Sequence, residues 1–133
     1  MTADFGINVV CHKGDLRFAS ACICSIRTEL GDVPICVFVD GSVDISPLVR
    51  TYGVQVVRPE DVHPELRRWS YGYGLTKMLM FWHSPFARFL YVEADAVVWG
   101  NLLSVARVEG TDFVVNEPHE EYTSFIVRSQ YFD

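Results

Sequence analysis

The segment RFLYVEADAVVWGN, from Arg88 to Asn101, decides the predicted fold. It begins with a nearly continuous apolar run, rich in β-branched and aromatic residues, which predicts a strand buried on both faces. Two acids, Glu93 and Asp95, follow that run one residue apart, and acids are costly to bury without partners. Because open α/β sheets bind ligands at the carboxyl ends of their strands, we expect both carboxylates to face a cation in a cleft.

Upstream of this segment, predicted strands alternate with predicted helices. The expected elements are, in order, a strand over residues 7–11, a helix over 16–30, a strand over 33–39, a helix that Ser46 opens and Gly53 ends, and a strand over 54–57. Asp15 is the expected N-cap of the longer helix, and Leu48 and Val49 are expected to face inward from the shorter one. The alternation predicts an α/β fold with a parallel sheet and right-handed crossovers.

The region between the third strand and the quoted segment has a different pattern. Residues 58–74 carry prolines, glycines and serines and are expected to form a long loop, which in a compact domain is usually functional or mobile. A helix over 75–83 should follow, and the residues expected to face the core from it are Leu75, Met78, Leu79 and Trp82. Beyond Asn101 the expected elements are a short helical turn and strands over 112–116 and 123–127.

Length and composition indicate one folded domain over residues 1–133. Hydrophobic residues make up 50% of the chain and charged residues 21%, which is typical of a sequence that folds around a core. The net charge of −6 argues against a general nucleic-acid binder, because such a protein needs a basic face. No apolar run reaches the roughly 18 residues of a membrane helix, and the first residues lack a signal-peptide pattern, so we expect a cytoplasmic protein.

The four cysteines show no spacing typical of zinc ligands. They are Cys11, Cys22, Cys24 and Cys36. Cys22 and Cys24 lie two residues apart on a predicted helix, so their side chains diverge. We therefore expect free, buried thiols.

The carboxylates of Glu93 and Asp95 suggest a metal site. Residues i and i+2 of an extended strand point to opposite faces, but both can reach one site where the strand ends in a turn. Hard oxygen ligands suit Mg²⁺ or Mn²⁺, which commonly bind one or two carboxylates together with substrate phosphates. Such a metal neutralises charge on a departing diphosphate. The alternative is a pair of exposed acids in a loop.

Three stretches resemble one enzyme family. RFLYVEADAVVWGN resembles the acid-x-acid segment of GT-A-fold glycosyltransferases, especially the glycogenin-like family (glycosyltransferase family 8). KMLMFWHSPFARFLY, from Lys77 to Tyr91, resembles that family's helix and following strand, and VFVDGSVD, from Val37 to Asp44, is similar to its second-strand end. The resemblance covers roughly residues 7–116. It implies a GT-A fold, a Rossmann-like and mainly parallel sheet flanked by helices.

The resemblance also implies a nucleotide-sugar donor, commonly a UDP-sugar, with Mn²⁺ or Mg²⁺ bridging its diphosphate. Carried over by position, Asp95 is a direct metal ligand, and Glu93, one methylene longer than the family's usual aspartate, contacts the ribose or the metal. Lys77 matches a basic position near the donor phosphates or sugar, and a solvated helix residue is the alternative. Other positions implied beside the nucleotide are Asp40 at the uracil edge, His12 and Lys13. For Asp40 the alternative is turn chemistry, which Asp-Gly-Ser favours.

Basic and aromatic residues of the long loop are candidates for a lid, with guanidinium groups on phosphate and rings on the sugar, or else belong to an ordinary surface loop. They are Arg67, Arg68, Trp69, Tyr71 and Tyr73. His119 is better explained as an exposed histidine than as a metal ligand. The family's later histidine ligand and acceptor half have no counterpart after Val127. We therefore expect a partial chain or a minimal donor-binding half, with exposed apolar surface that favours homo-oligomers.

Three functions are compatible with the sequence. The first is a metal-dependent glycosyltransferase that moves a sugar from a nucleotide diphosphate to an unknown acceptor. The second is a non-catalytic nucleotide-sugar-binding or assembly module. The third, a sugar-phosphate nucleotidyltransferase, needs a glycine-rich phosphate loop after the first strand, where CHKGDLR offers only Gly14. We rank them in that order.

Overall fold

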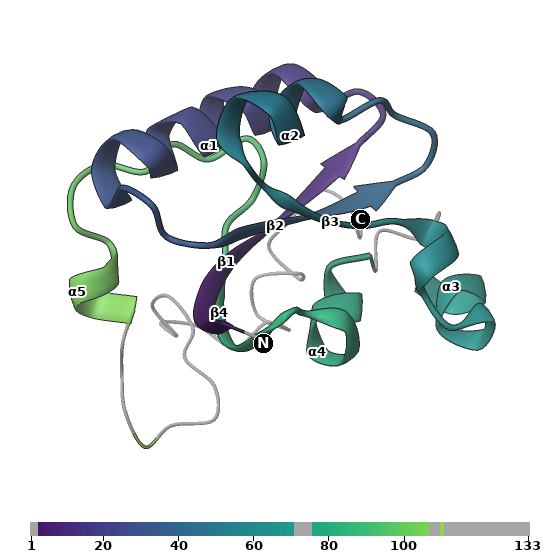
Figure 1. The fold of residues 1–133 in the computed structure, drawn as a ribbon. Coiled ribbons are helices and arrows are strands. Elements are labelled where there is room, and N and C mark those ends of the chain that lie inside the picture. The colour runs from purple at the N-terminus through teal and green to yellow at the C-terminus, as the bar shows by residue number, and fades with distance from the viewer. Residues whose placement is uncertain (1–2, 71–75, 107–109, 111–133) are drawn as a thin grey trace, which may run out of the picture.

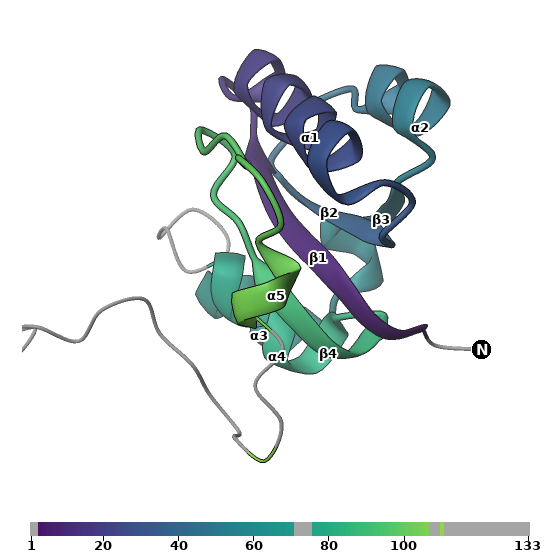
Figure 2. The same cartoon turned by 90° about the vertical axis from the view of Figure 1, so that its left-hand side faces the viewer.

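A four-stranded parallel sheet forms the middle layer of the computed structural model, which describes residues 3–70, 76–106 and 110 (Figure 1). Its strands are β1 (Ala3–His12), β2 (Ile35–Asp40), β3 (Gln55–Val57) and β4 (Phe86–Tyr91). The helices are α1 (Leu16–Leu30), α2 (Ser46–Tyr52), α3 (Pro64–Ser70), α4 (Met80–His83) and α5 (Leu103–Ala106), with 3₁₀ turns η1 (Pro59–Asp61) and η2 (Thr76–Leu79). Helices α1 and α2 cover one face of the sheet, and α3 and α4 cover the other (Figure 1, Figure 2). The predicted α/β fold with a parallel sheet is confirmed.

The strands lie in the order β3-β2-β1-β4, so the direction of travel across the sheet reverses at β1. From β1 the chain moves outward through β2 to β3, with α1 and α2 as the connections. It then passes α3 and α4 on the opposite face and adds β4 to the free side of β1 (Figure 1). This is a Rossmann-like arrangement, and it brings the carboxyl ends of β1 and β4 side by side although they are far apart in sequence.

Strand β1 is buried because both of its faces are covered. Ile7, Val9 and Cys11 pack on the side of α1 and α2, together with Ile23 and Ile26 of α1. On the opposite face, the residues that form the second core cluster are Val10, Cys36, Phe38, Val62, Leu79, Met80 and Phe86. Alternate residues of β1 therefore serve different layers, as expected for a strand inside a parallel sheet.

Strand β4 is not the strand buried on both faces that the sequence predicts. Within the described sheet it pairs with β1 alone, Ala87 and Arg88 are exposed, and Phe89–Tyr91 are only partly buried. Its apolar run arises because Leu90 packs towards the α1 side, while Phe89 and Tyr91 pack towards the α4 side. A short apolar run thus corresponds to two half-covered faces here, and the inner strands of the described sheet are β1 and β2.

Two predictions within residues 58–83 are wrong. The expected long loop contains η1 and α3 within its described part. The helix expected over 75–83 begins as the 3₁₀ turn η2, whose three residues per turn shift the buried stripe to Thr76, Leu79 and Met80. Met78 and Trp82 are consequently 42% and 62% exposed. Leu75 lies outside the described residues.

Other local predictions have mixed outcomes. Gly31 and Gly53 follow α1 and α2 with positive φ, as expected for helix ends, and α5 is the helical turn predicted beyond Asn101. In α2, Leu48 is buried but Val49 is 38% exposed, contrary to prediction. The strands expected over 112–116 and 123–127 lie outside the described residues. No helix within the described ranges is long and apolar enough to cross a membrane.

All four cysteines are free thiols, and Cys11, Cys22 and Cys36 are buried as predicted, whereas Cys24 is exposed. Burial raises the pKa of Cys11 and of Cys22 to about 11, and that of Cys36 to about 12. Because the thiolate is the reactive form, these three side chains act as small apolar core residues.

Gly6 generates a prediction about packing between β1 and β4. A Cβ at this position would lie 2.4 Å from Phe86 Cε2, so the ring would have to move. We predict that Gly6→Ala lowers the free energy of unfolding by about 1–3 kcal/mol, measured by urea denaturation. Gly14→Ala is the control, because nothing lies within 4 Å of its added Cβ, and it should be neutral. Equal stability of the two variants would contradict the close approach of Phe86 to β1.

Candidate functional site

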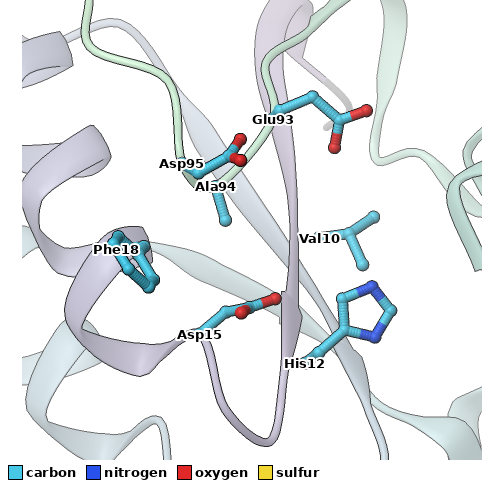
Figure 3. Close-up of a pocket in the computed structure, with 7 residues that line it drawn as sticks. All are labelled: Val10, His12, Asp15, Phe18, Glu93, Ala94 and Asp95. Carbon is cyan, nitrogen blue, oxygen red and sulfur yellow. The ribbon is translucent and has the colours of Figure 1, made fainter.

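A pocket of about 250 Å³ opens at the carboxyl ends of β1 and β4, where the strand order reverses (Figure 3). Its lining residues come from the end of β1, the start of α1 and the segment after β4, and they are Val10, His12, Asp15, Phe18, Glu93, Ala94 and Asp95. Open α/β sheets bind ligands at this place, so the pocket is the candidate functional site.

The acid pair lies in a turn that begins directly after β4. The amide of Val92 donates to the carbonyl of Asn8 at 3.0 Å, which keeps the chain beside β1 for one more residue. The amide of Ala96 then donates to the carbonyl of Glu93 at 3.0 Å and closes a turn. Because the backbone turns here, Glu93 and Asp95 both line the pocket, whereas an extended strand would send them to opposite faces.

The carboxylates of Glu93 and Asp95 have different surroundings. The Glu93 carboxylate points away from Asp95 in Figure 3 and accepts a hydrogen bond from the hydroxyl of Tyr91. Its other oxygen lies 3.6 Å from Lys77 Nζ, and both side chains are about half exposed, so this pair adds little stability. Burial, the hydrogen bond to Glu93 and nearby negative charge raise the pKa of Tyr91, which therefore remains a hydrogen-bond donor. Asp95 is exposed at the pocket.

Asp15 occupies the predicted N-cap position of α1 but does not cap it through its side chain. Its φ of −102° and ψ of 4° lie outside the β region that N-cap residues usually adopt, and no side-chain cap hydrogen bond forms. The carboxylate lines the pocket instead. Burial of the Cys11 thiol is the larger cause of its raised pKa, and the negative charge of Asp15 is the second cause. The sequence prediction assigned Asp15 to the helix end and missed its place in the site.

The segment after the acidic turn runs along α1 and is held there by polar side chains on one stripe of that helix (Figure 2). Cys22 Sγ donates to the carbonyl of Glu93 at 3.5 Å, and Ser25 Oγ accepts from the amide of Val98 at 2.9 Å. Glu29 Oε2 accepts from the amide of Gly100 at 2.9 Å. Residues 93–100, which include the apolar residues 96–99, therefore form a strap across α1 and do not continue the strand.

A second polar group joins the ends of β1, β2 and η2. His12 and Asp40 are register partners on neighbouring strands, and His12 Nδ1 lies 2.9 Å from Asp40 Oδ2. The hydroxyl of Thr76 donates to the same Asp40 oxygen at 2.5 Å. The Asp40 side chain is only 12% exposed, whereas that of His12 is 48% exposed and lines the pocket.

The structure brings some predicted site residues together and leaves others apart. Glu93, Asp95 and His12 line one pocket, Lys77 reaches it through Glu93, and Asp40 reaches it through His12. Lys13 lies in the exposed turn after β1 and is not among the lining residues. Of the lid candidates, Arg67 and Arg68 are exposed on α3, while Tyr71, Tyr73, the side chain of Trp69 and the metal-ligand candidate His119 lie outside what the structure describes.

Several residues at the site were not singled out from the sequence. Phe18 is 57% exposed at helix α1, and its ring adds an apolar wall to the pocket. Thr76 and Tyr91 orient Asp40 and Glu93 without lining the pocket themselves. Phe18 lies in the first turn of the helix that follows the first strand, so its nearness to a strand end was a sequence signal for a place in the site. No sequence signal pointed to Thr76 or Tyr91.

The carboxylate oxygens of the pocket suit a hard cation, with one restriction. Carboxylate oxygens from Asp15, Glu93 and Asp95 are the ligand type that Mg²⁺ and Mn²⁺ prefer. Across the described part of the chain, however, no three side chains of His, Cys, Asp or Glu are grouped closely enough to hold a metal ion. A divalent cation here would therefore depend on Asp95 together with oxygen atoms from a ligand or from water, a mode that is common for Mg²⁺.

Comparisons of the sequence with protein-family models and with curated proteins find no match. The family resemblance therefore rests on its motif residues alone, and the structure establishes a parallel, Rossmann-like α/β sheet.

The strap across α1 predicts that Ser25 stabilises the segment that carries the acids. Ser25→Ala removes the acceptor of the Val98 amide, and a polar group left without its partner costs about 1–3 kcal/mol of unfolding free energy. Urea denaturation should show this loss, and hydrogen exchange at the Val98 amide should quicken.

Thr28→Ala is the matched control, because the Thr28 hydroxyl donates to the carbonyl of Cys24 within α1 and has no hydrogen bond to the strap. It should leave the exchange rate of Val98 unchanged. If Ser25→Ala also leaves that rate unchanged, the strap does not depend on Ser25.

Proposed function

We propose that this chain binds a nucleotide-diphosphate sugar, with a UDP-sugar as the expected donor, and acts as a metal-dependent glycosyltransferase on an acceptor of unknown identity. The observation that carries the proposal is the position of the acid pair. Glu93 and Asp95 lie in a turn at the point of the sheet where the strand order reverses, inside the pocket that β1 also borders. Nucleotides bind at that point in other folds of this architecture.

The charge of the pocket supports a metal requirement. Its ionisable lining side chains are three carboxylates and one histidine, from Asp15, Glu93, Asp95 and His12. A diphosphate would be repelled by this set unless a cation stood between them. When bound, Mg²⁺ or Mn²⁺ would supply Lewis-acid stabilisation of the negative charge on the departing diphosphate.

The chain's own residues have separable roles in this proposal. Asp95, exposed at the pocket and without a hydrogen-bonded ion pair among the described residues, is the carboxylate available to the metal. Glu93 is turned towards Tyr91 and Lys77, and in this proposal its carboxylate contacts the ribose. Lys77 brings a positive charge to the rim, where it favours the donor phosphates. Val10, Ala94 and Phe18 supply apolar surface to the rest of the ligand.

A non-catalytic binding module is the second candidate, and one observation favours it. Every residue that lines the pocket comes from β1, the start of α1 or the turn after β4, and the proposal assigns all of these residues to the donor and none to an acceptor. Release of UDP from a UDP-sugar in the presence of candidate acceptor sugars separates the two. Turnover supports the transferase, and tight donor binding without turnover supports the module.

Asp95→Asn tests the metal-dependent donor site. A thermal shift assay with UDP and Mn²⁺ together should raise the melting temperature of the wild-type chain, because a ligand at 100 times its Kd stabilises by about 2.7 kcal/mol. Neither UDP nor Mn²⁺ alone should do so. The variant should remain folded and lose the shift, because it removes one negative charge at an exposed position.

Asp32→Asn makes the same change at an exposed position beyond the end of α1, at the opposite end of the sheet, and should retain the shift. A folded wild-type chain that shows no shift with UDP and Mn²⁺ would contradict the proposed donor site. An Asp95→Asn variant that still responds would contradict the role of Asp95.

A further inference from the structure

His12 and Asp40 form an ordered pair at the carboxyl ends of neighbouring strands. Parallel pairing of β1 with β2 sets them opposite one another, and His12 Nδ1 lies 2.9 Å from Asp40 Oδ2. The same oxygen accepts the hydroxyl of Thr76 at 2.5 Å, and the Asp40 side chain is 12% exposed. Asp40 is thus turned into the protein, while His12 stands at the pocket in Figure 3.

We propose that Asp40 is a positioning residue, which holds His12 in the tautomer that presents Nε2 to the pocket as a hydrogen-bond acceptor. In this proposal His12, and not Asp40, contacts the ligand. Asp40 therefore does not take the place at the uracil edge that the family resemblance implies for it.

The chemistry of the two side chains leads to this assignment. An ionised carboxylate only accepts hydrogen bonds, so the imidazole nitrogen that faces Asp40 must carry a proton. A neutral imidazole has one ring proton, and Nε2 is then left with its lone pair. Thr76 binds the oxygen that holds the imidazole and so limits rotation of the carboxylate. A carboxylate partner on one ring nitrogen is a common way to fix the tautomer of a histidine.

The assignment predicts which chemical group the pocket selects. With Nε2 as an acceptor, all four polar side chains that line the pocket accept hydrogen bonds, since Asp15, Glu93 and Asp95 are carboxylates. A ligand group that forms a hydrogen bond with His12 must therefore be a donor. This step rests on the proposed function, in which the ligand is UDP. Two parts of UDP are such donors, the ring N–H of uracil and a ribose hydroxyl. Cytosine lacks the first of these, because its ring nitrogen at that position is an acceptor.

Nuclear magnetic resonance of the full chain with ¹⁵N-labelled histidine tests the tautomer without any ligand. At alkaline pH the His12 ring, identified by its loss in His12→Gln, should show a protonated Nδ1 and an unprotonated Nε2. In Asp40→Asn the new amide can donate to Nδ1, so the proton should move to Nε2 in part or in full. Asp44→Asn, the same change at an exposed position in the loop that follows β2, should leave the ring unchanged. A wild-type ring with its proton on Nε2 overturns the proposal.

Binding of UDP, CDP, 2′-deoxy-UDP and 3′-deoxy-UDP in the presence of Mn²⁺ tests the selected group. The wild-type chain should bind UDP about 10- to 100-fold more tightly than the analogue that lacks the donor in question, the range expected for one lost hydrogen bond. A preference over CDP identifies the base N–H, and a preference over a deoxy analogue identifies the ribose hydroxyl. His12→Ala and Asp40→Asn should each reduce that preference while binding of UDP still requires Mn²⁺.

The outcomes separate this inference from the proposed function. Two results overturn the role of His12 and leave the donor site intact. In the first, binding requires Mn²⁺ but UDP and all three analogues bind equally tightly. In the second, the preference for UDP persists in both His12→Ala and Asp40→Asn. Failure of a folded wild-type chain to bind UDP overturns the proposed function. The histidine spectrum then still decides whether Asp40 fixes the tautomer.

Discussion

The site depends on one constraint, the position of β1 between β2 and β4. Strand β1 is buried on both faces and hydrogen bonds to a neighbour on each side, so its end is among the best-defined points of the described sheet. Pairing with β2 sets His12 opposite Asp40, and pairing with β4 brings the acidic turn beside it. Residues that lie about 80 positions apart thereby share a pocket, because the strands that carry them are neighbours in the sheet.

A cluster of carboxylates works against folding, and the surroundings of this one reduce that cost. Asp15, Glu93 and Asp95 repel one another across the pocket. Tyr91 and Lys77 draw the Glu93 carboxylate away from Asp95, and α1 holds the backbone of the strap through Ser25 and Glu29. The remaining repulsion between Asp15 and Asp95 is what a bound cation would relieve. Binding sites commonly retain such local conflict because the ligand resolves it.

Sequence patterns predicted the fold where the spacing of apolar residues is regular and where a glycine marks the end of a helix. Helix α1 has apolar residues at helical spacing and is followed by Gly31, and the buried parts of β1 and β2 are apolar apart from Asn8. The place of the acid pair at a strand end was also predictable. Burial of β4 was not, because a short apolar run looks the same whether its faces are fully or partly covered.

The finer parts of the site depend on contacts that sequence spacing does not encode. Ser25 and Glu29 look like ordinary surface residues of a helix, yet they hold residues more than 70 positions away. The link between His12 and Asp40 follows from strand register, and Thr76 reaches Asp40 from a 3₁₀ turn that was predicted as part of a regular helix. Each of these contacts depends on tertiary packing and not on local pattern.

Paramagnetic broadening by Mn²⁺ is the most direct test of the central claim, that the pocket between β1 and β4 is the ligand site. Amide spectra of the ¹⁵N-labelled chain would be recorded with UDP and increasing Mn²⁺. The account predicts that broadening starts at the amides of the two turns that border the pocket, residues 12–15 and 93–96, and reaches Asp32 and Phe86 last. Broadening centred elsewhere, or no broadening that depends on UDP, would contradict it.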